Sequence, residues 1–232
     1  MRYLLAVIYL LSLSGCATIF VPHYNVTVDA VAAKDALDKK SYVLMPANIG
    51  MSWNDTEFRE VANYVWRSLN TRGYVFTKNV NEADLRIEVS YGISAPKAEQ
   101  YIDYVPIMST IPSGNSVAVV ITGYREETRT RYLYYKYLSI AGFDYSLQKT
   151  PQSIVEIGAN SGKGNKAPLW KTTVSNNDGT DDLTNLIPVF VTAAIPYIAT
   201  NIDQQKQLSI SDEDLTLTMI RGKPSNEVDH KQ

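Results

Sequence analysis

The chain holds a single cysteine, Cys16, and the residues before it suit a cleavage site. Leu13, Ser14 and Gly15 precede it, and the two small residues can enter the narrow site of a signal peptidase. A thiolate is a nucleophile, so the Cys16 side chain can take up a lipid group through a thioether bond. The residue types and their spacing therefore predict a lipid-modified cysteine at the start of the mature chain.

These four residues resemble the lipobox of bacterial lipoprotein precursors. The preceding segment agrees, because Arg2 supplies a short basic region and residues 4–13 form an apolar run interrupted only by Ser12. Such a run reaches about 15 Å as a helix, roughly half of a bilayer's hydrocarbon thickness, so it is an export signal rather than a membrane span. The resemblance implies cleavage before Cys16, diacylglyceryl transfer to its thiol and acylation of the new amine, for example by palmitate. A plain secretory signal that ends near a chance cysteine is the alternative.

Lipidation would make the membrane the first expected partner. Two or three acyl chains, at about 0.8 kcal/mol per buried methylene, hold a protein on a membrane permanently. Ala17 stands where enteric lipoproteins with an inner-membrane retention signal have aspartate. The resemblance therefore implies the outer membrane, with the protein facing the periplasm.

Composition excludes several function classes. The 232 residues carry 22 basic and 24 acidic side chains, a net charge of −2, which gives no positive field for nucleic acid. One cysteine excludes a disulfide framework and a thiolate zinc site. The two histidines, His23 and His230, lie near the ends of the chain. We therefore expect no enzyme, no catalytic residue, no metal site and no cofactor.

The pattern along the chain divides it into four parts: a signal peptide at 1–15, a lipidated N-terminus and tether at 16–40, one α+β domain at 41–203, and a polar, mobile tail at 204–232. The alternation over residues 24–30 leaves room for an edge strand in the tether. Leu215, Leu217 and Met219 alternate likewise and leave room for a short strand in the tail.

Hydrophobic periodicity places the main elements of the domain. Residues 41–46 and 85–93 are predicted strands, and residues 55–72 a helix with a capping box of Asn54 and Glu57 and a stop at Gly73. Residues 117–121 are expected as a buried strand, and residues 125–131 as a charged turn or strand end. Residues 182–201 are apolar on nearly every side and interrupted by Pro188 and Pro196, which favours a buried, kinked helix over a membrane contact.

The predicted fold class is α+β: a largely antiparallel sheet packed by two main helices in a layered sandwich, after the N-terminal signal peptide. Residues 42–46, 69–74 and 83–91 are similar to a family of uncharacterised bacterial envelope lipoproteins with a small α/β domain of unknown function. Residues 153–159 and 169–175 match that family's later hairpin, whose second strand carries a Trp. The resemblance covers residues 41–201 with an expanded middle at 95–152, and it implies a fold and a compartment but no catalytic residue.

Four tyrosines in the expanded middle are the candidate binding residues: Tyr132, Tyr134, Tyr135 and Tyr137. Large amphipathic rings on a strand can stack sugars or bury against a protein partner. The structural alternative is that tyrosines favour strands and half-buried faces. Strand alternation puts two of the four on each face, which favours that alternative.

Three hypotheses of function follow. The first is a noncatalytic, lipid-anchored envelope protein that binds an envelope protein partner or supports envelope assembly, and the second is a carbohydrate or peptidoglycan binder that uses the tyrosine-rich strand. The third, a carboxylate hydrolase, has only arbitrary candidates in Glu88 and Asp103, because no spacing identifies an acid/base pair. Residues 158–164 are no phosphate loop, since the glycine spacing is one residue short and Gly164 replaces the hydroxyl residue.

Overall fold

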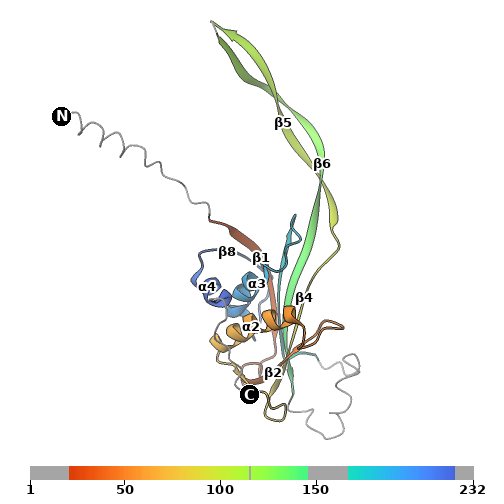
Figure 1. Ribbon diagram of the computed structural model, residues 1–232, viewed down its shortest axis with the longest axis vertical. Coiled ribbons are helices and arrows are strands. Elements are labelled where there is room, and N and C mark those ends of the chain that lie inside the picture. The colour runs from red at the N-terminus through yellow and green to blue at the C-terminus, as the bar shows by residue number, and fades with distance from the viewer. Residues whose placement is uncertain (1–20, 115, 146–166, 223–232) are drawn as a thin grey trace, which may run out of the picture.

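The computed structural model describes residues 21–114, 116–145 and 167–222 and shows a mixed α/β fold around one large sheet (Figure 1). In these residues the sheet has eight strands in the order β3-β2-β4-β6-β7-β1-β8, with β5 paired to β6 outside this path. Strand β2 pairs in parallel with β3 and β4, and the remaining pairs are antiparallel. The strands are β1 (His23–Ala32), β2 (Ser41–Pro46), β3 (Val75–Phe76), β4 (Leu85–Ile93), β5 (Lys97–Ser113), β6 (Ser116–Asp144), β7 (Trp170–Asp178) and β8 (Lys206–Ser211).

Three α-helices are present in the described residues, one more than the two main helices expected. They are α2 (Thr56–Thr71), α3 (Ile187–Ala194) and α4 (Leu215–Arg221), and the short 3-10 helix η2 (Ile195–Tyr197) follows α3 directly. Their buried faces join one face of the sheet in a single hydrophobic cluster. In strand β4 the side chains alternate between buried and half-exposed, as the sequence predicts, so one face of the strand packs in this cluster.

Helix α2 lies within one residue of its predicted bounds at each end. Gly73 adopts a positive φ of 75°, and the N–H groups of Gly73 and Tyr74 bond back to carbonyls of the last turn at 3.0 Å. The capping box expected from Asn54 and Glu57 is wrong, since Asp55 is the N-cap residue and its side chain makes no capping bond. The stop signal was thus correct and the start signal was not.

The last apolar segment forms a shorter helix than the predicted 182–201. Pro188 lies at the beginning of α3, where a missing N–H costs no helical bond, and Pro196 falls in η2. All eight residues of α3 are buried, as expected for a core helix. None of the described helices combines the length and the apolar character needed to cross a membrane.

Trp170 is the bulkiest of the fully buried side chains, and a glycine makes room for it. Its ring lies 6.0 Å from that of Tyr74, centroid to centroid. Gly142 is its partner across the β6–β7 pair, and a β-carbon at Gly142 would overlap the indole. The strand that carries Trp170 is the one expected at residues 169–175, whereas residues 153–159 lie outside the described part of the chain.

The folded body extends beyond residues 41–203 on both sides. Strand β1 is an inner strand, with β7 on one side and β8 on the other, rather than an edge strand of a tether. Helix α4 forms where a strand in a mobile tail was expected, and it buries Leu217 and Ile220. These two residues are three apart, which suits a helix, and Asp214 caps it by accepting the N–H groups of Thr216 and Leu217 at 2.7 and 3.2 Å.

Strand β5 and residues 116–133 of β6 form a hairpin that we call the arm, and Figure 1 shows it projecting far from the body. Strand β6 pairs with β4 and β7 in its second half but with β5 alone in the arm. The expectation of a buried strand at 117–121 is wrong, because Val117, Val119 and Ile121 are 56–68% exposed. The charged segment 125–131 is not a turn either, since it lies within the continuous strand.

Candidate functional site

The root of the arm is marked by Lys136, where β6 leaves its neighbours in the body. Pairing with β4 ends at Lys136 opposite Ile93, and pairing with β7 ends at Tyr134 opposite Asp178. The Lys136 side chain is fully buried, and its Nζ donates to Asp178 Oδ1 at 2.5 Å and to the carbonyl and Oγ1 of Thr180 at 2.5 and 3.1 Å. These three bonds use all three donors of the ammonium group, which makes its burial tolerable.

Two opposing effects act on the pKa of Asp178. Burial acts to raise this pKa, but hydrogen bonds from Lys136 and from the backbone and side chain of Thr180 outweigh it, and the pKa is lowered. The carboxylate is therefore ionised at neutral pH and remains the counter-ion of the buried lysine.

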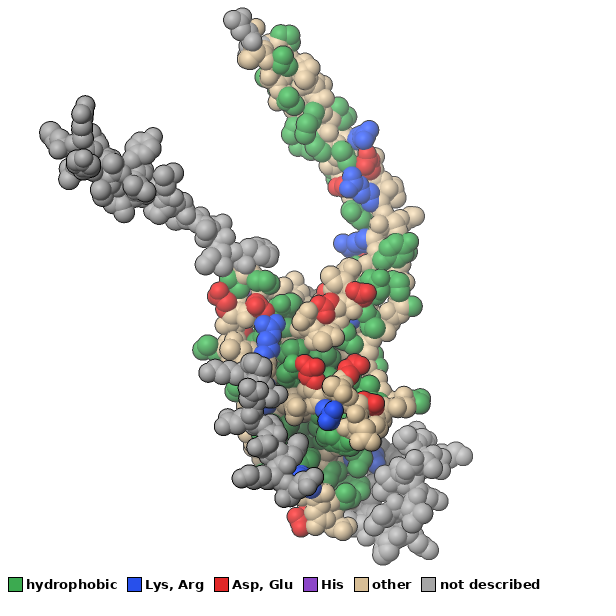
Figure 2. All heavy atoms as spheres, in the orientation of Figure 1, with side chains coloured by type: hydrophobic (Ala, Val, Ile, Leu, Met, Phe, Trp, Pro, Cys, Tyr) green, Lys and Arg blue, Asp and Glu red, His purple; other side chains and the backbone are tan. Residues whose placement is uncertain are grey.

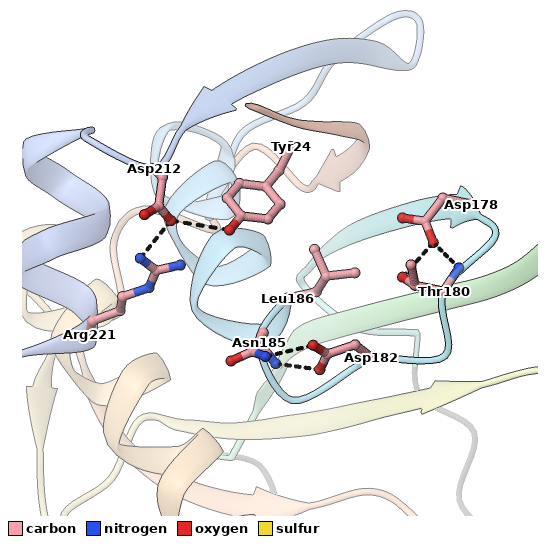
Figure 3. Close-up of a pocket in the computed structure, with 8 residues that line it drawn as sticks. All are labelled: Tyr24, Asp178, Thr180, Asp182, Asn185, Leu186, Asp212 and Arg221. Atoms are coloured by element: carbon pink, nitrogen blue, oxygen red, sulfur yellow. Dashed lines mark hydrogen bonds and ion pairs between the residues drawn. The ribbon is translucent and has the colours of Figure 1, made fainter. Parts of the chain in front are cut away.

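A pocket of about 540 Å³ lies beside this root (Figure 3). It is open to solvent, and its walls come from the start of β1, the end of β7, the segment before α3, and the residues around α4. The lining residues are Tyr24, Asp178, Thr180, Asp182, Asn185, Leu186, Asp212 and Arg221.

The other two carboxylates of the pocket are also held by neighbours. A hydrogen bond from Arg221 at 2.8 Å lowers the pKa of Asp212, with a further bond from the Tyr24 hydroxyl at 3.1 Å. The backbone N–H of Asn185 and then its side chain lower the pKa of Asp182. The three carboxylates of the pocket are therefore ionised at neutral pH, whereas a general acid needs a carboxyl group with a raised pKa.

Glu88 and Asp103, the arbitrary hydrolase candidates, are not brought together. Glu88 lies opposite Ala141 and Asp103 opposite Glu127, so the two positions are about 45 Å apart along β6. Each carboxylate has its own ion pair, and that of Asp103 is with Arg129 at 3.0 Å. In the part of the chain that the structure describes, no three His, Cys, Asp or Glu residues are grouped to hold a metal ion.

The four candidate tyrosines lie where β6 passes from the body into the arm. Tyr132 and Tyr135 are exposed, whereas Tyr134 and Tyr137 are half-buried. The rings of Tyr135 and Tyr137 stack with centroids 6.2 Å apart and planes 23° apart, and Tyr137 also lies against Gly92. The structure therefore offers a two-ring platform on one face rather than a four-ring one.

The register of its strands assigns the side chains of the arm to two faces. Residues directly opposite each other share a face, and the pairs Pro106–Tyr124, Met108–Ile121 and Pro112–Val117 lie on one. We call this the apolar face; it consists of Tyr104, Pro106, Met108, Thr110, Pro112, Val117, Val119, Ile121, Tyr124 and Glu126. Figure 2 shows hydrophobic side chains along the arm toward its tip and charged ones nearer the body.

A β-bulge keeps this face continuous. Ile107 pairs with Gly123 and Met108 with Ile121, so Thr122 is an extra residue on β6. Its Oγ1 lies 3.2 Å from the Ser109 hydroxyl and 3.3 Å from the carbonyl of Ile107. Without the extra residue, strict alternation would separate the odd-numbered Ile121 from the even-numbered Tyr124. The bulge places both on the same side.

The opposite face carries the ion pairs of the arm in the half nearest the body, whereas toward the tip it is mostly apolar, with Ile107, Ile111, Ala118 and Val120. Arg131 pairs with Glu99 at 2.7 Å and Arg129 with Asp103 at 3.0 Å, both across the two strands. Arg129 also bonds to Glu127 at 3.2 Å, and these acidic neighbours raise the pKa of its guanidinium.

The projecting hairpin was not predicted from the sequence, although the residues of its turn are typical of a hairpin. Gly114 has a positive φ of 62°, and the Gly-Asn pair at 114–115 stands between two alternating runs, a typical hairpin signature. The lipobox residues Leu13, Ser14, Gly15 and Cys16 lie outside the described residues, so their lipidation stays a prediction.

No family model and no curated protein matches this chain. Among solved structures it is similar to a PDZ domain protein from Parabacteroides distasonis, with 11% identity, 82% of this chain but only 39% of that chain covered, and a TM-score of 0.41. It is also similar to a DUF4136 family protein from Bacteroides thetaiotaomicron, with 14% identity, 78% and 98% coverage and a TM-score of 0.34. A third similar structure is the PelC dodecamer from Paraburkholderia phytofirmans, with 10% identity, 78% and 99% coverage and a TM-score of 0.30. None of the three assigns a family or a function to this chain.

Proposed function

We propose that this chain is a noncatalytic lipoprotein of the bacterial outer membrane, anchored through Cys16 and facing the periplasm, that acts in partner binding or in envelope assembly and maintenance. The anchor is supported by the sequence before Cys16, which combines a basic residue, a short apolar run and two small residues. The partner-binding role is supported by the arm.

The arm is the single observation that carries the role. A two-stranded hairpin is at best marginally stable alone in water, yet this one leaves the body with none of the described side chains from residue 97 to 135 buried. A large exposed apolar surface on a soluble domain marks an interaction site. The apolar face therefore fits contact with another component of the envelope, protein or membrane, better than it fits turnover of a small substrate.

The carboxylates support the noncatalytic part of the proposal. Asp178, Asp182 and Asp212 are ionised and each is held by residues of the pocket itself. None of the three has the raised pKa that a carboxyl group needs to act as a general acid near neutral pH.

Site-specific photo-crosslinking in intact cells tests the role. A photoreactive phenylalanine analogue replaces Tyr104 on the apolar face or, as a matched exposed aromatic control, Trp66 on α2. We expect crosslinks to an envelope component from position 104 and none from position 66. Equal labelling from both positions, or none from position 104, would contradict a role for the arm in binding.

A second candidate, carbohydrate or peptidoglycan binding, is favoured by the stacked pair of Tyr135 and Tyr137. Exposed aromatic rings can stack on sugars, and Tyr135 is 46% exposed. Peptidoglycan fragments should then bind the native chain and the Tyr132→Ser variant but not Tyr135→Ser. Absence of binding across a glycan panel removes this candidate.

A further inference from the structure

The size of the apolar face matches the hydrocarbon layer of a membrane. From Tyr104 to Pro112, strand β5 rises by about 27 Å. The apolar band of strands that cross an outer membrane is about 25 Å tall and is bordered by aromatic residues. Tyr104 lies at the end of the band nearest the body, with Glu126 opposite it. Tyr124 belongs to the next pair on the same face, opposite Pro106. Below this level the same face is mixed, since Gln100, Thr128 and Thr130 are polar whereas the exposed Ile102 is apolar.

The anchor and the arm lie at the same end of the body. Thr27 of β1 is opposite Ser175 of β7, and the following residues of β7 run alongside the root of the arm as far as Tyr134. The side chain of Asn176 confirms the closeness by donating to the carbonyl of Asn25 at 2.8 Å. The start of β1 therefore lies at the edge from which the arm projects (Figure 1).

Chain length between the anchor and the body is short. Cys16 is seven positions before His23, where β1 begins, so even a fully extended chain spans at most about 25 Å. The arm reaches about 55 Å along its 17-residue strand β5. A membrane that holds Cys16 would thus lie within reach of the arm.

We infer that the apolar face of the arm enters the hydrocarbon of the membrane that holds the Cys16 anchor. The inference rests on the proposed anchor for the side from which the membrane approaches. Three observations support it independently. The exposed side chains of this face are apolar, the band that they form is as tall as the hydrocarbon layer is thick, and the arm projects from the end of the body that carries the anchor.

Backbone groups at the outer edges of the two strands need partners in hydrocarbon, where water is absent. Arms of neighbouring copies therefore lie side by side, with β5 of one copy next to β6 of the next.

Neighbouring valines provide a matched test. Val119 lies on the apolar face opposite Thr110, and Val120 lies on the other face opposite Ser109. A cysteine at either position in the full-length chain carries an environment-sensitive fluorophore, since an acylated Cys16 does not react with it. The labelled proteins are added to phosphatidylethanolamine–phosphatidylglycerol vesicles with or without nitroxide groups on the acyl chains.

The inference predicts that the label at 119 shifts its emission to the blue and loses most of its intensity to the nitroxide lipids, while the label at 120 loses much less. Flotation with the vesicles and the mass of the Cys16 peptide report the anchor separately. An anchored protein whose label at 119 is not quenched overturns the inference and leaves the proposed anchor standing. Quenching at 119 in a protein whose Cys16 peptide carries neither lipid nor fluorophore would support entry of the arm into the membrane and refute the anchor.

A second copy of the chain is the competing occupant, and the same samples exclude or identify it. If the apolar face were covered by protein alone, the label at 119 would be shielded from aqueous iodide without any quenching by nitroxide lipids. That result would overturn the inference.

Discussion

Lys136 and Asp178 form an ion pair at the point where the arm leaves the body, with the ammonium fully buried and 2.5 Å from the carboxylate. The pair joins β6 to the end of β7, and the backbone and hydroxyl of Thr180 complete the shell around the ammonium. The ion pair thus adds a side-chain link between the two strands at the root of the arm, where their pairing ends at Tyr134.

Removing the carboxylate should cost more than removing the lysine. Asp178→Asn leaves a buried cation with a neutral partner, and we expect the free energy of unfolding to fall by about 2 kcal/mol, below the usual 3–5 kcal/mol because Asp178 is partly exposed. Lys136→Met removes the charge from the core and should cost less. Denaturant unfolding measures both, and a larger loss for Lys136→Met would contradict the argument.

The same pair predicts a dependence of stability on acid. The folded pKa of Asp178 is lowered, so its contribution is present above the unfolded pKa of about 3.9 and is lost as the pH falls through the folded value. The difference in unfolding free energy between the native chain and Asp178→Asn should be constant near neutral pH and shrink below about pH 4. A difference that does not change down to pH 2 would show that the carboxylate has no lowered pKa in the folded state.

Gly142 and Trp170 give a prediction about packing. Gly142→Ala places a methyl group against the buried indole, and overpacking of this kind costs about 1–3 kcal/mol. Gly123→Ala is the control, because a β-carbon there would meet only Ile107 at an ordinary 3.9 Å. Thermal unfolding should show a lowered midpoint for Gly142→Ala alone, and equal midpoints would show that the indole can move aside.

The hydroxyl groups of Tyr42 and Tyr24 should contribute differently to the free energy of unfolding. The Tyr42 hydroxyl is buried without a hydrogen-bond partner in the described structure, so Tyr42→Phe should leave the unfolding free energy unchanged or raise it. Tyr24→Phe removes a bond to Asp212 and should lower it by about 1 kcal/mol. Parallel denaturant titrations compare the two variants, and the opposite order would place a water or another partner at Tyr42.

Burial of aromatic hydroxyl groups also predicts a loss of stability in alkali. Burial raises the pKa of Tyr74 to about 12 and that of Tyr42 further. Because the folded pKa values exceed the unfolded value of about 10, this contribution is complete below pH 10 and is lost as the pH rises through the folded values. Tyrosinate absorbance should therefore rise together with unfolding for these two residues. A full tyrosinate signal near pH 10.5 in the folded protein would contradict their burial.

Local sequence patterns were sufficient to predict the elements that have one solvent-exposed face and one buried face. The alternation of β4 and the helical spacing of α2 gave their bounds closely, and Gly73 gave the stop of α2. Helix α4 was misread because Leu215 and Met219 continue an alternation with Leu217, although both of them are exposed on the helix. Periodicity gives only the spacing of apolar residues. It does not show which of them are buried, and the buried ones determine whether a helix or a strand forms.

The arm could not be predicted in the same way, because an alternating apolar run does not say what covers it. Val117, Val119 and Ile121 have the pattern of a core strand and lie in the open. The pairing of Lys136 with Asp178 joins residues 42 positions apart, which only the β6–β7 register brings together. The bulge at Thr122 has one signal, the neighbouring Gly123, because an isolated glycine within a strand is typical of a bulge.

Mass spectrometry of the N-terminal peptide, taken from protein extracted out of the native membrane, tests the lipid anchor directly. We expect a mature chain that begins at Cys16 and carries a diacylglyceryl group on its thiol. A chain that retains residues 1–15, or one in which Cys16 is unmodified, would contradict it.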